Sequence, residues 1–359
     1  MSDEGTAGVE PVDPSPAVSR RALLGGAGVL AVGAGGAALL RRGGAASDGP
    51  AGPHGGHGYG HTSAAAAAPP VPHEGSAPVG YGHGMMPPRT VTREDALALA
   101  TPPPADVGRG RVRDYDLSVT EQRLEVAEGV SVYAWRYGGR VPGPIIRATE
   151  GDRLRIRMDN RTEHPHNVHL HGRHDPAMDG IEPIAPGASF TYDLVAEPTG
   201  LHPYHCHVMP VSEHIGRGLY GTMIVDPPGG RAPAHEFVLV MGGWDLNGDG
   251  REELVTFNGI AGLYERHPIT VPVGEPVRLY LVNLVEHEPV VTFHLHADTF
   301  DIFRSGTSLT PDEHSDVVAL TQGDRAIVEF TLRRRGRYMF HPHQTHLAER
   351  GAMGWIAAV

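Results

Sequence analysis

The sequence predicts an all-β protein made of two β-sandwiches in tandem, and three observations support this prediction. From about Arg111 to the C-terminus, short runs of alternating apolar and polar residues are separated by Gly, Pro, Asp and Asn, the pattern of strands joined by turns. The same region shows little of the 3.6-residue periodicity of amphipathic helices. The third observation is an internal repeat, which indicates that each half of this region forms one sandwich.

The repeat places matching motifs in the same order in the two halves. The matches, first copy before second, are residues 151–157 and 274–280, His169-Leu170-His171 and His294-Leu295-His296, and His205-Cys206-His207 and His341-Pro342-His343. A Pro- and Gly-containing stretch at residues 227–233 separates the halves. We therefore expect domain 1 at residues 108–228 and domain 2 at residues 232–359, each of ordinary size for one domain.

The N-terminal part of the chain is predicted to be an export signal followed by a disordered linker. Residues 1–46 contain Arg20-Arg21 before a weakly apolar Gly/Ala/Leu run, as in a twin-arginine signal; a retained membrane anchor is the alternative. Residues 47–107 are rich in Ala, Gly, Pro and scattered His, and such a segment buries too little apolar surface to offset its ordering entropy. The expected location is extracellular, cell-surface or periplasmic.

The composition excludes some partners and some chemistry. The formal net charge is -12, and an acidic chain is repelled by nucleic acid, so we expect no nucleic-acid partner. Cys206 is the only cysteine, so no internal disulfide can form. Its thiol is therefore either inert and buried or functional, and the flanking His205 and His207 favour a functional thiol.

The His-x-His pairs are the clearest indication of metal chemistry. Successive side chains of a strand point to opposite faces, so both imidazoles of a pair project to one side. Four of the five pairs occupy matched positions in the two halves: His169 and His171, His205 and His207, His294 and His296, and His341 and His343. Eight imidazoles exceed the needs of one structural metal ion, but imidazole binds copper, zinc, iron and nickel alike.

Cys206 selects copper among these metals. Two histidines and one thiolate in a trigonal arrangement, with a weak axial group, form the blue-copper pattern. His214 follows Cys206, and the apolar Leu219 lies further on, in the order that such sites use. Met209 is the alternative axial residue. With Leu219 in the axial position the copper lacks a thioether ligand, and we expect a higher reduction potential.

The second histidine of this site is expected from a neighbouring strand. His166, three residues before His169, is well placed for this role. His164 is the rival, but Pro165 and the spacing make it the weaker candidate.

On these residues the chain resembles the multicopper oxidases, specifically the two-domain, laccase-like members with the type 1 copper in the N-terminal domain. The motifs that carry the resemblance are residues 140–147 (RVPGPIIR), 166–172 (HNVHLHG), 205–207 (HCH), 218–221 (GLYG), 294–296 (HLH) and 340–343 (FHPH). The likeness covers about residues 111–359. It implies two tandem cupredoxin-like Greek-key β-sandwiches after a signal peptide and disordered linker.

The resemblance also implies which histidines bind each copper ion. His169 and His294 would hold the type 2 copper. The type 3 pair would be held by His171, His205, His207, His296, His341 and His343. With the type 1 copper on His166, Cys206 and His214, this gives about four copper ions per chain.

Three further expectations accompany the resemblance. Pro342 and Val291 stand where a second cysteine and type 1 histidine would be, so only domain 1 should hold a blue copper. Asp179 matches the acidic residue that relays protons to the cluster, with Glu213 and Glu349 as weaker candidates. The two-domain relatives form homotrimers in which domain 1 of one subunit meets domain 2 of the next at the cluster.

Three functions remain open on sequence alone. The first is an oxidase that couples oxidation of a phenolic or metal-ion substrate to reduction of dioxygen to water. The second is a copper-containing nitrite reductase, which needs only one isolated type 2 copper and leaves four complete His-x-His pairs unexplained. The third is a non-enzymatic copper-binding or electron-transfer protein, which needs the Cys206 site but not the eight other histidines.

Overall fold

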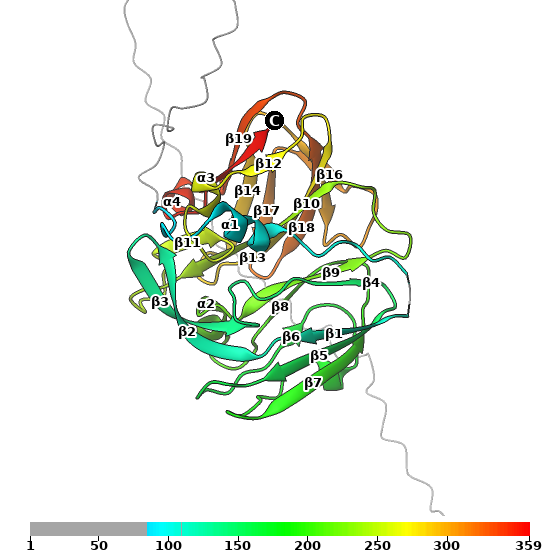
Figure 1. Cartoon of the computed structure of the whole chain (residues 1–359), viewed down its shortest axis with the longest axis vertical. Coiled ribbons are helices and arrows are strands. Elements are labelled where there is room, and N and C mark those ends of the chain that lie inside the picture. Colours follow the sequence, from blue (N-terminus) through cyan, green and yellow to red (C-terminus); the bar gives the residue numbers. More distant parts are fainter. Residues whose placement is uncertain (1–84, 109) are drawn as a thin grey trace, which may run out of the picture. The chain divides into compact units, whose positions relative to one another are not determined.

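The computed structural model describes residues 85–108 and 110–359, so the predicted signal region and most of the predicted linker lie outside the described residues. Within these ranges no helix has the length and the apolar character needed to cross a membrane. The few helices are short (Figure 1): α1 (Arg93–Ala100), η1 (Pro176–Met178), α2 (Val211–Gly216), α3 (Leu263–Arg266) and α4 (Thr345–Glu349).

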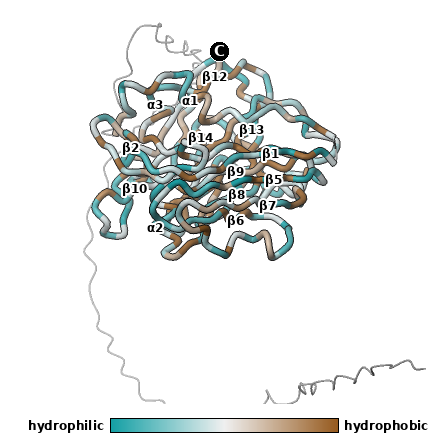
Figure 2. The backbone as a smooth tube through the Cα atoms, turned by 60° about the horizontal axis from the view of Figure 1, so that its bottom comes forward, coloured by the Kyte–Doolittle hydropathy of each residue, from teal (hydrophilic) through white to brown (hydrophobic). Residues whose placement is uncertain are grey.

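Domain 1 consists of two sheets and a hairpin around one apolar interior. Its strands are β1 (Val112–Asp116), β2 (Val119–Ala127), β3 (Val130–Tyr137), β4 (Ile146–Thr149), β5 (Arg153–Asp159), β6 (His169–Leu170), β7 (Ser189–Val195), β8 (Gly200–His205) and β9 (Tyr220–Asp226). The sheets have the orders β1-β5-β7, β4-β9-β8-β6 and β2-β3. On β5, Leu154, Ile156 and Met158 are buried while the residues between them face outward. The apolar alternation in the sequence is thus an alternation of interior and surface, visible as changing colour along the strands in Figure 2.

Domain 2 is a larger sandwich of two sheets. Its strands are β10 (His235–Trp244), β11 (Leu254–Phe257), β12 (Ile269–Val271), β13 (Pro276–Leu284), β14 (Val290–Leu295), β15 (Phe300–Arg304), β16 (Glu313–Ser315), β17 (Val317–Thr321), β18 (Arg325–Thr331), β19 (Gly336–His341) and β20 (Gly354–Ala358). The sheet orders are β11-β10-β13-β18-β15-β16 and β12-β20-β19-β14-β17. Aromatic side chains such as Phe293 and Phe340, stacked 5.7 Å apart, fill the interior between them. The prediction of two tandem β-sandwiches is confirmed.

The two sandwiches of one chain share a third apolar cluster. Val126 and Ile224 of domain 1 lie in it with Val240, Tyr280 and Ile327 of domain 2, and all five are buried. Separating the domains would expose this surface to water, which costs free energy roughly in proportion to its area. The seam between the domains is therefore part of the folded interior.

The predicted linker extends too far toward the C-terminus. The prediction assigned residues 47–107 to a disordered segment, but Arg93–Ala100 forms helix α1, and two of its alanines are buried in the interior of domain 2. Thr92 and Asp95 exchange side-chain and backbone hydrogen bonds at the start of the helix, which is a capping box. The capping box and the burial of one helix face stabilise a segment whose composition alone indicated disorder.

Candidate metal centre

The first two His-x-His pairs lie on adjacent antiparallel strands, with His169 on β6 opposite His205 at the end of β8. Together with His171 and His207 they form the domain 1 histidine cluster. Neighbouring ring centres in this cluster are 5.2 to 6.1 Å apart. Because side chains alternate along each strand, the four imidazoles face one side of the sheet.

Hydrogen bonds determine which ring nitrogens face the centre of this cluster. His169 Nδ1 donates to the carbonyl oxygen of Asp179 at 2.8 Å, and His205 Nδ1 donates to that of Cys206 at 2.9 Å. The Nε2 atoms of His171 and His205 lie 3.2 Å apart. Burial lowers the pKa of His171 to about 3 and that of His205 to about 4. Both rings are therefore neutral near pH 7, which is the form that binds a metal ion.

The domain 2 histidine cluster, His294, His296, His341 and His343, repeats this arrangement on β14 and β19. His294 Nδ1 donates to the carbonyl oxygen of Asp316 at 2.8 Å, and His341 Nδ1 donates to that of Pro342 at 2.6 Å. The Nε2 atoms of His296 and His341 lie 2.8 Å apart. Each of these contacts has its counterpart in domain 1, so the repeat in the sequence is also a repeat in side-chain geometry.

The two clusters do not meet within one chain. In both views of the described residues, β6 lies well apart from β14 (Figures 1 and 2), and the ring contacts join histidines only within each cluster. The domain 2 cluster is also open to solvent, with His296 and His343 exposed. A site that combines both clusters therefore requires a second copy of the chain.

The Cys206 side chain points to the other face of its strand and meets His166 and His214. Its Sγ lies 3.2 Å from His214 Nδ1 and 4.0 Å from His166 Nδ1, and the two Nδ1 atoms are 3.1 Å apart. All three residues are buried, with 0% to 5% of their surface exposed. The three residues predicted to form a thiolate site thus converge on one point.

The identity and spacing of these donor atoms suit a trigonal metal ion. Ligands with bonds of about 2.0–2.3 Å, as zinc makes to the same donors, lie about 3.5–4 Å apart around a trigonal metal. The 4.0 Å pair matches this spacing, and the 3.1 and 3.2 Å pairs are a few tenths of an ångström shorter. Burial, aided by the neighbouring His214, lowers the pKa of His166 to about 3, so its ring is neutral. Burial also raises the pKa of the Cys206 thiol, so a bound cation would have to displace its proton.

Sequence comparisons agree with this geometry. Two family profiles, both described as multicopper oxidase, match residues 118–230 and 243–358. The chain belongs to the multicopper oxidase family. A solved structure described as a multicopper oxidase is 39% identical, with a TM-score of 0.71, over 75% of this chain and all of that one.

Two further relatives differ in their chemistry. A blue copper oxidase from Nitrosomonas europaea is 29% identical, with a TM-score of 0.62, over 69% of this chain and 86% of that one. A copper-containing nitrite reductase from Neisseria meningitidis is 30% identical over 273 residues, which are 68% of this chain and 70% of that protein. Membership of the multicopper oxidase family implies copper binding, whereas the similar proteins include both oxidases and nitrite reductases.

Of the two axial candidates, only Leu219 lies beside the thiolate. Leu219 is fully buried, belongs to the same apolar cluster as Cys206, and its carbonyl oxygen accepts the Cys206 backbone N–H at 3.0 Å. Met209 is 78% exposed, so its sulfur faces solvent rather than the Cys206 site. The alternative prediction, that Met209 is the axial residue, is therefore wrong. His164, the rival of His166, is exposed on the outer side of the site.

Asn167 supports the Cys206 site in a way that sequence reasoning missed. Its Oδ1 accepts the backbone N–H of His207 at 2.7 Å and lies 3.6 Å from Cys206 Sγ. The same carboxamide donates to the carbonyl oxygen of Ile181 at 3.2 Å. Thr292 takes the matching place in domain 2, where its hydroxyl accepts the His343 N–H at 2.7 Å. Asn167 and Thr292 each lie two residues before the first histidine of a His-x-His motif, so the repeat shows that they correspond. The sequence does not show which backbone N–H each one binds.

Asp179 is the candidate proton relay that contacts a histidine cluster. Its Oδ1 lies 3.3 Å from His169 Nδ1 and 3.0 Å from His174 Nε2. The next residue, Gly180, has φ +74°, and a Cβ there would overlap the carbonyl oxygen of Val168. Glycine is therefore required for the turn that brings Asp179 against the cluster.

The two weaker candidates for the proton relay, Glu213 and Glu349, have no described contact with a histidine cluster. Glu213 forms an ion pair with Arg217 at 3.1 Å, and Glu349 is exposed on α4. Asp316, which the sequence reasoning missed, takes the place of Asp179 in domain 2, with Oδ2 3.8 Å from His294 Nδ1. The internal repeat was the signal that could have identified Asp316.

Domain 2 has apolar residues in place of the thiolate site. Val291 is fully buried where domain 1 has His166, and Pro342 is buried where domain 1 has Cys206. Neither side chain carries a metal donor. Among the described residues the thiolate site is therefore confined to domain 1, because Cys206 is the only cysteine of the chain.

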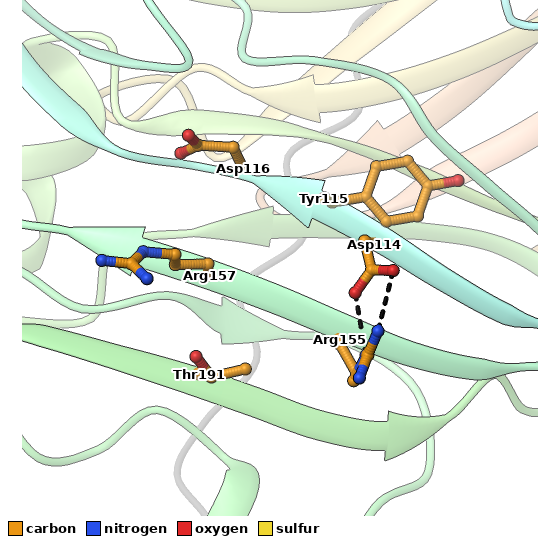
Figure 3. A pocket seen from close by; sticks show the side chains of 6 residues that line it. All are labelled: Asp114, Tyr115, Asp116, Arg155, Arg157 and Thr191. Carbon is orange, nitrogen blue, oxygen red and sulfur yellow. Dashed lines mark hydrogen bonds and ion pairs between the residues drawn. The ribbon is translucent and has the colours of Figure 1, made fainter.

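A large hollow on domain 1 is separate from these sites. It has a volume of about 510 Å³ and lies over β1, β5 and β7 (Figure 3). Charged side chains such as Asp114 and Arg155, joined by hydrogen bonds of 2.8 and 2.9 Å, line it. This sheet carries no member of either histidine cluster, so the hollow plays no part in the metal centre.

Proposed function

We propose that this chain is a laccase-like oxidase. It takes electrons one at a time from a phenolic or metal-ion substrate at the Cys206 site and delivers them to dioxygen, which is reduced to water between the two histidine clusters. The observation that carries this proposal is the complete set of four histidines in domain 2, oriented as in domain 1. A nitrite reductase with one isolated type 2 copper, or an electron carrier, would leave most of that second set without a role.

The ligand assignment is the one that the family resemblance implies. His166, Cys206 and His214 would hold the type 1 copper, with Leu219 as the expected axial residue. His169 and His294 would hold the type 2 copper. The other cluster histidines would hold the type 3 pair: His171, His205, His207, His296, His341 and His343. About four copper ions per chain would supply the one-electron redox steps and the binding of dioxygen.

The residues of the chain connect and serve the two sites. Cys206 is joined by peptide bonds to His205 and His207, so the backbone offers the shortest covalent path between the thiolate site and the domain 1 cluster. Asp179 holds His169 in the tautomer that presents Nε2 to the cluster. Its carboxylate, 3.0 Å from His174 Nε2, would move protons toward the oxygen-reducing site.

A homotrimer completes the proposed site. The two histidine clusters of one chain do not meet each other, so domain 1 of one subunit would meet domain 2 of the next. A head-to-tail ring would repeat this contact at every interface. Each ring of three would hold three clusters. Export by a twin-arginine signal to the cell surface, periplasm or medium is the corresponding proposal for location.

Nitrite reduction is the second candidate, because a nitrite reductase is among the similar proteins. Copper analysis, absorption spectroscopy and an oxygen electrode separate the two. Close to four copper ions per chain, a blue band and oxygen uptake with a phenol are expected for the oxidase. About two copper ions per chain, with nitrite turnover and no oxygen uptake, would instead establish the reductase.

Subunit complementation tests the shared cluster. One variant loses the domain 1 half (His171→Ala with His205→Ala) and the other loses the domain 2 half (His296→Ala with His341→Ala). Each alone should consume no oxygen. Random co-assembly in a head-to-tail ring restores an intact pair of halves at about one quarter of the interfaces, so about a quarter of wild-type oxygen uptake should return on co-expression.

The control for this experiment is a mixture of the two separately purified and assembled variants, which should remain inactive while subunits do not exchange. Co-expressed variants that stay inactive, although mixed oligomers are detected by mass, would show that the clusters do not combine between subunits.

A further inference from the structure

Trp135, on strand β3, covers the histidines of the Cys206 site. Its ring centre lies 4.7 Å from that of His166 and 4.8 Å from that of His214. The exposed His164 contacts another part of the same ring at 5.1 Å. Since His166 is fully buried and His214 is only 5% exposed, a molecule in solvent reaches little or nothing of either residue. It meets the atoms that cover them.

The environment of Trp135 is unusual for a residue that serves only to fill space. The side chain is 2% exposed, yet its indole N–H has no hydrogen-bond partner among the described residues. Leaving such a donor unpaired costs free energy, and buried tryptophans usually avoid this cost. A phenylalanine would fill most of the space without it. Trp135 places an easily polarised aromatic ring against the imidazoles of His166 and His214. We therefore consider a functional role for this side chain beyond packing.

Arg217 connects this ring to the surface. Its guanidinium carbon lies 4.7 Å from the centre of the Trp135 ring, and its carbonyl oxygen accepts the Trp135 backbone N–H at 2.8 Å. Arg217 is also part of the wall of a cavity of about 380 Å³ at the seam of the two domains. The other lining residues are Ser212, Glu213, Gly216, Asp245, Gly248, Gly250 and His287.

The far wall of this seam cavity is held in place by the β10–β11 loop. Asp245 accepts backbone N–H groups from Gly248 at 2.6 Å and Gly250 at 2.9 Å. Partial burial raises the pKa of Asp245, but these hydrogen bonds outweigh it and lower the pKa overall. The near wall is helix α2, which carries His214. The cavity thus lies between α2 and the β10–β11 loop. Arg217 of its wall stacks on Trp135, and Trp135 in turn contacts both histidines of the Cys206 site.

We propose that small one-electron donors bind in the seam cavity against Arg217, and that the electron reaches His166 and His214 across the ring of Trp135. The inference rests on the proposed function, because it needs a redox metal at the Cys206 site. In each step the donor loses one electron and the Cys206 site gains it. Trp135 forms no bond, exchanges no proton and ends the step in its starting state.

The physical reason is contact. Electron tunnelling becomes slower with distance, and more steeply so through empty space than through packed atoms. The described contacts give one packed route: cavity, Arg217, Trp135, and the two imidazoles. An aromatic ring conducts such coupling better than a saturated side chain of similar size. Trp135 is therefore assigned a role in the rate of electron uptake and not in holding the metal.

The test compares two Arg-stacked tryptophans. Trp355 lies on β20 of domain 2, with the guanidinium of Arg337 4.6 Å from its ring centre, and it contacts no thiolate site. Trp135→Leu and Trp355→Leu are reduced without oxygen by hexaammineruthenium(II), and bleaching of the blue band is followed by stopped flow. Trp135→Leu should bleach about tenfold more slowly, equivalent to about 1.4 kcal/mol in activation free energy, with copper content and reduction potential retained. Trp355→Leu should bleach at the wild-type rate.

A second experiment leaves Trp135 in place and obstructs the seam cavity. Ser212 is exposed at its wall, so Ser212→Cys can be labelled with a bulky maleimide, whereas Cys206 is buried. The labelled protein should bleach more slowly than the unlabelled variant at equal potential. This experiment tests the role of the cavity even if Trp135→Leu does not fold.

The outcomes distinguish the two proposals. A blue wild-type protein in which Trp135→Leu bleaches as fast as wild type, or faster because the histidines become exposed, overturns the role of Trp135. Unchanged bleaching after labelling at position 212 overturns the role of the cavity. A wild-type protein that binds copper without any blue band overturns the proposed function itself, and with it this inference.

Discussion

Replacing Cys206 with serine should abolish the blue absorption and the uptake of electrons from substrate, while copper at the histidine clusters is retained. The alcohol of serine keeps its proton and is a hard donor, so it cannot replace a soft thiolate at copper. The substitution changes the volume of a fully buried side chain very little, and its backbone bond to Leu219 persists. The fold and the two histidine clusters should therefore survive.

Absorption spectra and copper content per chain measure this result. Loss of about one copper ion out of four, with no remaining blue band, is the expected outcome. Met209→Leu is the matched control, because Met209 lies in the same loop but is 78% exposed. It should keep the blue band. A Cys206→Ser protein that loses all its copper, or that remains blue, contradicts the division into two kinds of site.

The fold and most of the candidate ligands could be predicted from the sequence because both depend on the same two-residue period. In a strand, that period decides which residues enter the interior, as in β5, and it also makes His169 and His171 face one side. The internal repeat then supplied the second sandwich and its cluster. The alternation of side chains along each strand, present in both halves of the chain, was therefore enough to predict the fold and the two clusters.

What the sequence could not supply depends on contacts between distant segments. Composition assigned Arg93–Ala100 to a linker, although Thr92 and Asp95 were a readable capping signal, because the helix is stabilised by domain 2. Trp135 lies on a strand far in sequence from His214, and nothing local in its sequence indicates that their rings touch. The exposure of Met209, which removed it as an axial candidate, likewise follows from the folded loop.

The second large effect is expected from Glu236→Ala, which should lower the free energy of unfolding by about 3–5 kcal/mol. Glu236, on β10, accepts hydrogen bonds from Arg147 of domain 1 at 2.7 Å and from Arg278 of domain 2 at 2.9 Å. The side chains of these arginines are only 4% and 3% exposed. Burial raises the pKa of Glu236, but its hydrogen bonds from Arg147 and Tyr280 outweigh this and lower the pKa overall. The carboxylate is therefore charged near pH 7. Removing it leaves Arg147 with Asp226 and Arg278 with Glu329, so each buried guanidinium loses one of its two carboxylate partners.

Denaturant unfolding of the metal-free protein measures this effect, and Glu275→Ala is its control. Glu275 forms an ion pair with His235 at 2.6 Å, but its side chain is 57% exposed. Its loss should therefore lower the free energy of unfolding by less than about 1 kcal/mol. Arg147 lies in domain 1, whereas Glu236 and Arg278 lie in domain 2, so the lost Arg147–Glu236 contact crosses the seam between the sandwiches. The Glu236→Ala protein should consequently unfold over a broader range of denaturant, as the domains begin to separate before either unfolds. Equal midpoints and slopes for the two variants would mean that the shared apolar cluster, and not this ion network, holds the domains together.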